Sequence, residues 1–260
     1  MAEQNYVELR HVNKKYKDFQ ASDDINFGIG KGKLIGLLGP SGSGKTTILR
    51  MLAGLEHADS GEIIIDGRVV NDVPASERGI GFVFQNYALF RYMTVYDNIA
   101  FGLDVKKWKK ADIRRRVDEL VELVGLKGFE KRYPNQLSGG QRQRAWIAMT
   151  LAQETEMILL DEPTTYLDMA YQLDVLQLLE RMNREKQLTI VMVLHDLNEA
   201  CRFADHIIGL KNGKVVCEGR PADVITRENI REIYGIDAKL VMSDGGYPIC
   251  MEFDRVIKTL

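Results

Sequence analysis

The 260-residue sequence predicts an α/β fold built around a parallel sheet, and three observations support this prediction. Short apolar runs typical of buried strands alternate along the chain with segments of helical period. A glycine-rich loop, GPSGSGKT, joins one such strand to a helix. A hydrophobic content of 45% is enough for a sizeable core, which fits one large domain or one domain with a subdomain.

The first third of the chain contains strands and one strand–loop–helix unit. The segment TTILRMLAGL, which follows the glycine-rich loop, has a helical period and ends near Gly54. Lys31 and Gly32 supply a turn before the strand that leads into the loop. Strands are expected at Tyr6–Leu9, around Ile25, Phe27 and Ile29, and at Leu34–Leu38, Glu62–Ile65 and Gly81–Phe84.

From about residue 86 to 152 helical signals replace the strand signals. One apolar stripe with helical spacing ends at Gly125 and consists of Ile113, Val117, Leu120, Val121 and Val124. This pattern predicts a helical insertion in the α/β fold.

The alternation of strands and helices resumes after the insertion and makes a parallel sheet the expected core. Asn212 and Gly213 are a strong signal for a hairpin turn. Strands are expected at Met157–Leu160, Thr189–Leu194, His206–Leu210 and Lys214–Cys217, and helices at about Asp168–Lys186 and Asn198–Phe203.

Composition excludes several classes of protein. A net charge of −2 gives no reason to expect a nucleic-acid partner, and the basic run from Lys106 to Arg116 is interpreted as a solvated surface. Cys201, Cys217 and Cys250 lack the spacing of metal ligands, which is typical of structural thiols in a reduced intracellular chain. The chain begins without a secretory signal and contains no apolar run near the ~20 residues of a membrane-spanning helix, so we expect it to be soluble.

The loop from Gly39 to Thr46 fits the phosphate-binding pattern G-x-x-x-x-G-K-[ST] between a strand and a helix. Its backbone N–H groups can close on phosphates, Lys45 can reach the terminal phosphates, and Thr46 can ligate Mg²⁺. The sequence therefore predicts a nucleoside triphosphate bound with Mg²⁺, held by Gly39, Ser41, Gly42, Ser43, Gly44, Lys45, Thr46 and Thr47.

Two further motifs carry chemistry. The apolar strand MILLDE ends in Asp161, which suits Mg²⁺, and Glu162, which can act as a general base toward the attacking water. The alternative is a pair of surface acids after a strand. In LSGGQRQR, Ser138 can cap a helix while Gly139 and Gly140 let an anion approach its first N–H groups, which makes a second anion site.

Together with Gln85 after the strand GIGFVF and His195 after TIVMVL, these motifs resemble in order and spacing the ATP-binding cassette family, the ATPases of ABC transporters. The resemblance covers roughly Val7 to Gly219. It implies a P-loop NTPase, RecA-like α/β core with an antiparallel β subdomain and an inserted α-helical subdomain. The expected organisation is one ABC ATPase domain, with the core and β subdomain in residues 1–85 and 153–260 and the helical subdomain in residues 86–152.

Residue roles follow from the resemblance where the motifs match. Tyr16 would stack on adenine, or it is an ordinary tyrosine at a strand edge. Gln85 would contact Mg²⁺ or the attacking water, and His195 would contact the terminal phosphate and hold that water with Glu162. Asp168 would belong to the segment that crosses to a second subunit, cap the following helix, or do both. The implied catalytic residues are Glu162, His195, Gln85 and Lys45, and the implied metal ligands are Thr46, Gln85 and Asp161.

The resemblance also implies a partner copy, because the chain contains one copy of each motif. Two ATP molecules would lie between two chains arranged head to tail, each on one phosphate loop and facing Ser138, Gly139, Gly140 and Gln141 of the other chain. ATP hydrolysis would drive import through membrane-spanning subunits, with the chain cytoplasmic and at the inner face of the membrane when docked. Tyr87, Phe90 and Tyr92 would line the docking groove, or belong to the core of the insertion.

The two halves resemble different importers. Residues up to about 140 resemble the sulfate-importer branch, whereas those from about 140 to 260 resemble the branch that serves iron-siderophore, haem and cobalamin importers. The segment that follows His195 is short, which is typical of the second branch. We therefore hypothesise a recombinant or engineered chimera joined near Leu137–Arg144, with natural divergence as the alternative.

Two rival functions remain. A chimeric chain could bind nucleotide without driving transport, which ATPase activity of the isolated chain would distinguish. A soluble ABC protein of DNA repair or translation would need a long coiled-coil insertion or a second cassette, and the sequence contains neither.

Overall fold

The computed structural model describes residues 5–84 and 89–255. Its central sheet has the strand order β10-β9-β3-β8-β7-β6, in which only the pairing of β10 with β9 is antiparallel. This confirms the parallel α/β core that the sequence predicts. The strands are β3 (Leu34–Leu38), β6 (Ile80–Val83), β7 (Met157–Leu160), β8 (Thr189–Val193), β9 (His206–Lys211) and β10 (Lys214–Gly219).

A second, antiparallel sheet forms the N-terminal part, in the order β2-β1-β4-β5. Its first strand runs to Tyr16, well beyond the predicted end at Leu9. A bulge at His11 (φ 52°) shifts the alternation of buried and exposed side chains between Leu9 and Val12. This shift breaks the alternation from which a strand is recognised in a sequence. The strands are β1 (Val7–Tyr16), β2 (Phe19–Ile29), β4 (Ser60–Ile65) and β5 (Arg68–Val69).

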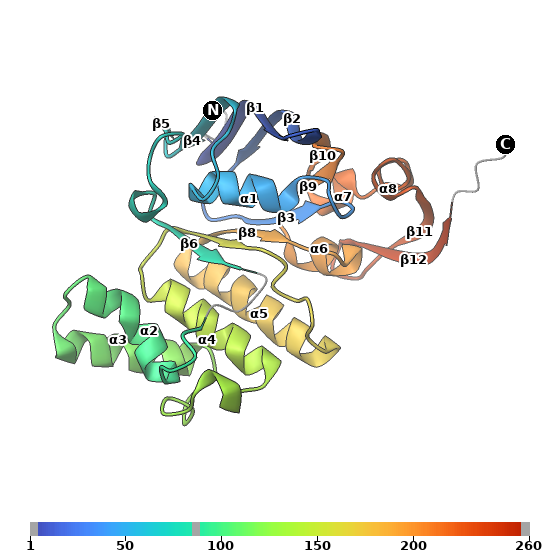
Figure 1. Cartoon of the computed structure of the whole chain (residues 1–260). Helices are drawn as coiled ribbons and strands as arrows, with labels where there is room; N and C mark the ends of the chain where they lie inside the picture. Colours follow the sequence, from blue (N-terminus) through green and yellow to red (C-terminus); the bar gives the residue numbers. More distant parts are fainter. Residues whose placement is uncertain (1–4, 85–88, 256–260) are drawn as a thin grey trace.

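Helix α1 (Lys45–Ala53) lies between the two sheets (Figure 1). Ile48, Leu49 and Leu52 are fully buried in a cluster that joins side chains of both sheets. The helix ends at Gly54, whose left-handed conformation (φ 75°) lets its N–H group donate to the carbonyls of the last turn. The predicted helix and its predicted end are therefore confirmed.

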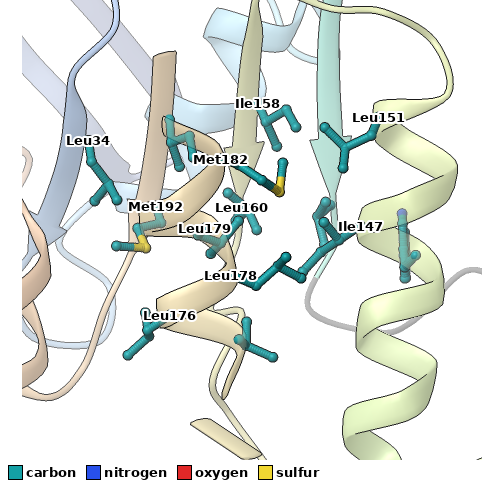
Figure 2. Packing of buried hydrophobic residues seen from close by; sticks show 14 of the residues in the cluster. Leu34, Ile147, Leu151, Ile158, Leu160, Leu176, Leu178, Leu179, Met182 and Met192 are labelled. Carbon is teal, nitrogen blue, oxygen red and sulfur yellow. The ribbon is translucent and has the colours of Figure 1, made fainter. Parts of the chain in front are cut away.

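The opposite face of the central sheet is covered by α5 (Met169–Lys186) and α6 (Leu197–Phe203). Figure 2 shows Leu178 and Met182 of α5 between Ile158 of β7 and Ile147 of a further helix, α4. Helices therefore occupy the predicted helical insertion, and α4 connects them to the core by packing on α5.

The elements of the insertion are α2 (Val95–Val105), α3 (Lys110–Leu123), the 3-10 turn Pro134–Gln136 and α4 (Gly139–Leu151). A separate 3-10 turn, Ala75–Glu77, precedes β6.

The C-terminal part contains a hairpin that the sequence does not reveal, β11 (Ile236–Met242) with β12 (Pro248–Arg255), preceded by α7 (Pro221–Val224) and α8 (Arg227–Tyr234). Asn198 of α6 holds β12, because its side chain accepts a bond from the Cys250 N–H (2.7 Å) and donates to the Cys250 carbonyl (3.2 Å). The Cys201 thiol, one turn further along α6, lies against the Cys250 thiol. All three cysteines are free thiols, as expected, but two of them meet. Across residues 5–84 and 89–255, every helix is too short or too polar to cross a lipid bilayer.

A buried asparagine holds the start of the helical insertion, and we predict that its loss destabilises the fold. Asn98 is fully buried; its carbonyl oxygen accepts from the Phe90 N–H (2.8 Å), and its amide donates to the carbonyls of Met93 (3.1 Å) and Thr94 (2.9 Å). Asn98→Ala should lower the free energy of unfolding by about 2 kcal/mol, since buried backbone groups lose their partners. Urea denaturation measures the change. The exposed Asn135→Ala should shift it by less than about 0.5 kcal/mol, and equal effects would contradict the prediction.

Candidate functional site

The loop between β3 and α1 is closed by glycines where no side chain fits. Gly39 (φ 148°) and Gly44 (φ 99°) have left-handed backbone conformations. A Cβ at Gly44 would lie 2.0 Å from the Ala21 carbonyl oxygen, and one at Gly39 would lie 2.2 Å from that of Leu210. The loop therefore passes close to neighbouring backbone and turns directly into the N-terminus of α1, where free N–H groups and the helix dipole favour an anion.

Lys45 begins α1 and is almost fully buried. Its Nζ donates to the carbonyls of Gly39 and Pro40, each at 2.8 Å, so the ammonium group lies against the loop. Burial lowers the pKa of Lys45, and the carboxylates of Glu162 and Asp161 oppose that shift. A buried cation with two acids nearby is an arrangement suited to the charges of a polyphosphate.

Thr46 and Asp161 bring a hydroxyl and a carboxylate together beside the loop. The Thr46 Oγ1 donates to the Asp161 Oδ1 at 2.9 Å, and Asp161 is buried at the end of β7. Burial raises the pKa of Asp161, while the bond from Thr46 opposes this effect. These are hard oxygen donors of the type that Mg²⁺ prefers, so the pair fits the predicted metal. The third predicted ligand, Gln85, lies outside the described residues.

Glu162 and His195 meet across the ends of adjacent strands β7 and β8. The His195 Nε2 lies 2.7 Å from the Glu162 Oε1, and the Thr165 hydroxyl donates to Oε2 of the same carboxylate at 3.2 Å. Glu162 has a left-handed backbone (φ 54°), a conformation that concentrates at functional sites in non-glycine residues. The carboxylate is thus held on both oxygens but retains some exposure (17%), which suits a base that must reach a water molecule.

A cleft with a volume of about 190 Å³ lies at the loop. It brings all the predicted phosphate-loop residues except Gly39 together with Glu162 and with one residue that the sequence did not indicate, Phe19. Phe19 is half exposed at the start of β2. An exposed aromatic in a β-turn carries no signal of its own, because only the folded antiparallel sheet lays this turn beside the loop. The cleft is lined by Phe19, Ser41, Gly42, Ser43, Gly44, Lys45, Thr46, Thr47 and Glu162.

Tyr16 lies at the end of β1, with 38% of its surface exposed. Its hydroxyl lies close to the Glu56 carboxylate and to the side chain of Thr47, the last of the predicted phosphate-loop residues. Burial raises the pKa of Tyr16, the Glu56 carboxylate adds to this rise, and Thr47 opposes it. Tyr16 is therefore both a strand-edge tyrosine and a neighbour of the candidate site.

The second anion motif lies elsewhere. The predicted cap is confirmed, because the Ser138 Oγ accepts from the Gln141 N–H (3.3 Å) and the Gln141 side chain accepts from the Ser138 N–H (3.0 Å) at the start of α4. Figure 1 shows the central sheet and α5 between α1 and α4. Among the residues that the structure describes, none of the four from Ser138 to Gln141 lines the phosphate-loop cleft of the same chain.

Asp168 caps α5, where its carboxylate accepts from the Tyr171 N–H at 3.1 Å. The capping interpretation of this residue is therefore confirmed. The same segment exposes two large apolar side chains, Tyr166 (83%) and Met169 (84%).

A separate groove of about 830 Å³ lies on the helical part. Tyr92, almost entirely exposed, lines this groove, whereas Phe90 packs on Phe101 with ring centroids 4.6 Å apart and is not among the lining residues. Tyr87 lies outside the described residues. The groove is lined by Leu89, Arg91, Tyr92, Tyr133, Pro134, Asn135, Gln136 and Arg142.

Comparison with known proteins agrees with this geometry. A family model described as ABC transporter matches residues 22–165, more than half of the chain. The sulfate/thiosulfate import ATP-binding protein CysA of Mycobacterium bovis is 51% identical over 218 residues, which cover 84% of this chain and 62% of that protein. The chain thus spans less than two thirds of the length of this relative.

Solved structures give the same result. The chain matches a dimeric post-hydrolysis state of the ATP-binding cassette MJ0796 bound to ADP and Pi, with 38% identity, a TM-score of 0.75, and coverage of 82% of this chain and 98% of that one. It also matches cbiO1 from Clostridium perfringens, part of the ABC transporter complex cbiONQ, with 29% identity, a TM-score of 0.81, and coverage of 88% and 94%. The fold class predicted from the sequence is therefore confirmed.

Glu199 of α6 contacts Thr164, two residues after Glu162, and we predict that the negative charge of Glu199 lowers the stability of the folded protein. The Thr164 hydroxyl donates to the Glu199 Oε2 at 3.3 Å. Burial and the neighbouring Asp196 raise the pKa of Glu199, and the bond from Thr164 opposes this. An acid whose pKa rises on folding destabilises the folded state above its ordinary pKa, because the fold must then hold a disfavoured charge.

Glu199→Gln keeps an oxygen for Thr164 and removes the charge. It should raise the Tm by a few degrees near pH 8, and the gain should disappear below about pH 4, where the carboxyl is protonated in both states. Thermal melts across this pH range measure the difference. A gain that grows on acidification would contradict the assignment.

Proposed function

We propose that this chain, which belongs to the ABC transporter family, binds and hydrolyses ATP as the nucleotide-binding subunit of a sulfate or thiosulfate importer. The observation that carries the ATPase assignment is the contact between Glu162 and His195, 2.7 Å apart, at a cleft formed by the phosphate loop. The transported anion is inferred from the mycobacterial relative, which is a sulfate/thiosulfate import protein.

Binding of the triphosphate rests on the loop and its lysine. The N–H groups at the start of α1 and the ammonium of Lys45 face anionic oxygens, and the helix dipole adds to this attraction. Lys45 exchanges its bonds to the carbonyls of Gly39 and Pro40 for bonds to phosphate oxygens. Thr46, Asp161 and Gln85 would hold Mg²⁺, which would supply positive charge beside the phosphates.

Hydrolysis rests on the carboxylate of Glu162. It accepts a proton from the attacking water as that water approaches the terminal phosphate. His195 donates a hydrogen bond to one carboxylate oxygen and Thr165 donates to the other, so that both fix the direction in which the base points. Positioning of this kind lowers the barrier by removing the freedom of the reacting groups.

One chain supplies only half of each proposed site. The cleft holds the phosphate loop, while the Ser138 turn lies on another part of the molecule (Figure 1). A head-to-tail pair related by a two-fold axis brings the turn of each copy against the loop of the other. The cassette MJ0796, which this chain resembles, forms a dimer.

The remaining partners are membrane-spanning importer subunits, which would hold the chain at the inner face of the membrane. The groove beside Tyr92 is the proposed docking surface, because its lining on the helical part combines this exposed aromatic side chain with Arg91 and Arg142. Residues 1–85 and 153–260 would form the core and residues 86–152 the helical subdomain.

The alternative is a chimera that binds nucleotide and drives no transport. It is motivated by the iron-siderophore resemblance of the second half. The match with the mycobacterial relative extends over 218 residues, so it runs past Leu137–Arg144 into that half. Separate comparison of the two halves tests the hypothesis, which fails if both are most similar to the same branch.

Glu162→Gln should cut ATP turnover by at least ~100-fold and leave ATP binding intact, because the variant loses the base but not the phosphate loop. Phosphate release and nucleotide titration measure the two effects. Glu154→Gln, an exposed glutamate away from the cleft, serves as the matched control and should retain wild-type turnover. Unchanged turnover in Glu162→Gln would remove this residue from the base role.

Lys45→Ala should abolish tight ATP binding, since the buried ammonium that faces the phosphates is lost. Equilibrium titration with ATP checks this expectation, and the exposed Lys33→Ala, at the opposite end of β3 from the loop, controls for the loss of one positive charge. Wild-type affinity in Lys45→Ala would be incompatible with the proposed phosphate loop.

A further inference from the structure

Lys14 of β1 is a buried lysine at the edge of the candidate site. Its side chain is only 11% exposed, and its Nζ lies 2.8 Å from the Glu56 Oε1 and 3.2 Å from the Asp59 Oδ1. The same Nζ lies over the ring of Tyr16, 5.2 Å from the ring centroid. Two acids therefore hold a cation against an aromatic ring beside the phosphate loop.

The far end of the Tyr16 ring is held as well. The hydroxyl lies close to the carboxylate of Glu56, which is also the ion-pair partner of Lys14, and to the side chain of Thr47 in the first turn of α1. Lys14, Glu56 and Tyr16 therefore lie against one another, and Thr47, which lines the phosphate-loop cleft, lies beside them. Because a ring that is fixed in advance loses little freedom on stacking, this arrangement favours a planar ligand.

We propose that Lys14 is a positioning residue for the nucleobase, which fixes the Tyr16 ring through Glu56 and places a cation on one ring face so that a purine stacks on the other. This inference rests on the proposed function, since it concerns the base of the bound nucleotide. A cation on one face draws electron density from the ring and strengthens its attraction for an electron-rich base on the opposite face. Purines present the larger stacking surface, so ATP gains more than UTP.

A second lysine–tyrosine pair in the same chain has similar contacts and serves as a structural comparison for Lys14 and Tyr16. The Lys31 Nζ lies 5.0 Å from the ring centroid of Tyr6 and 2.8 Å from Glu156, and the Tyr6 hydroxyl lies 3.4 Å from the same carboxylate. The chemistry matches that of Lys14, but Tyr6 is only 8% exposed, whereas Tyr16 is 38% exposed. Of these two pairs, the Lys14 pair is the one that combines a tyrosine surface open to a ligand with a position beside the phosphate loop.

The test compares three ligands, ATP, UTP and inorganic tripolyphosphate, by competition against a fluorescent nucleotide. Lys14→Met should weaken ATP binding about three- to tenfold and lower the preference for ATP over UTP, with tripolyphosphate binding unchanged. Lys14→Arg should restore ATP affinity because it keeps the cation. Lys31→Met, the matched control, should bind all three ligands as the wild type does.

Equal weakening of ATP and tripolyphosphate by Lys14→Met would overturn the proposal, because it would show general damage to the loop. Wild-type ATP affinity in Lys14→Met would overturn it as well. If Lys14→Met does not fold, Tyr16→Phe replaces it. Removal of the hydroxyl frees the ring and should weaken the binding of ATP but not that of tripolyphosphate. If Tyr16→Phe shows no such selective loss, the proposal is overturned. A wild-type chain that fails to bind ATP would instead refute the proposed function.

Discussion

The candidate site depends on one constraint, which is that the carboxyl ends of three buried parallel strands meet at the same edge of the central sheet. β3 leads into the phosphate loop, β7 ends before Asp161 and Glu162, and β8 leads to His195. All three strands are fully buried, and β8 lies between the other two. Since helices cover both faces of such a sheet, its strand ends are where polar side chains can converge on a ligand.

Local signals allowed much of this to be predicted. The phosphate loop, the acids at the end of MILLDE and the cap at Ser138 each depend on a few adjacent residues, so their positions follow from strand, loop and helix patterns. The bulge at His11 is different: it changes the phase of β1 and hides the strand that carries Lys14 and Tyr16. A one-residue shift reverses the faces of a strand, which simple alternation cannot anticipate.

Contacts between distant segments could not be predicted from the sequence. Phe19 reaches the cleft only through the packing of the antiparallel sheet on α1, and Cys250 meets Cys201 only through the hairpin held by Asn198. No spacing in the chain relates these pairs. The same limit applies to Lys14, whose partners Glu56 and Asp59 lie beyond α1. Sequence patterns thus predict the candidate reacting groups, whereas the contacts that orient them emerge from tertiary packing.

The central claim is that the phosphate loop and the Ser138 turn belong to one site only when two chains combine. An equimolar mixture of Lys45→Ala and Ser138→Arg chains tests it most directly, because one supplies an intact turn and the other an intact loop. Each variant alone should be inactive, and the mixture should recover about a quarter of wild-type ATP turnover, since half of the dimers are mixed and each has one intact site. Turnover in the mixture no higher than that of the separate variants would contradict the account.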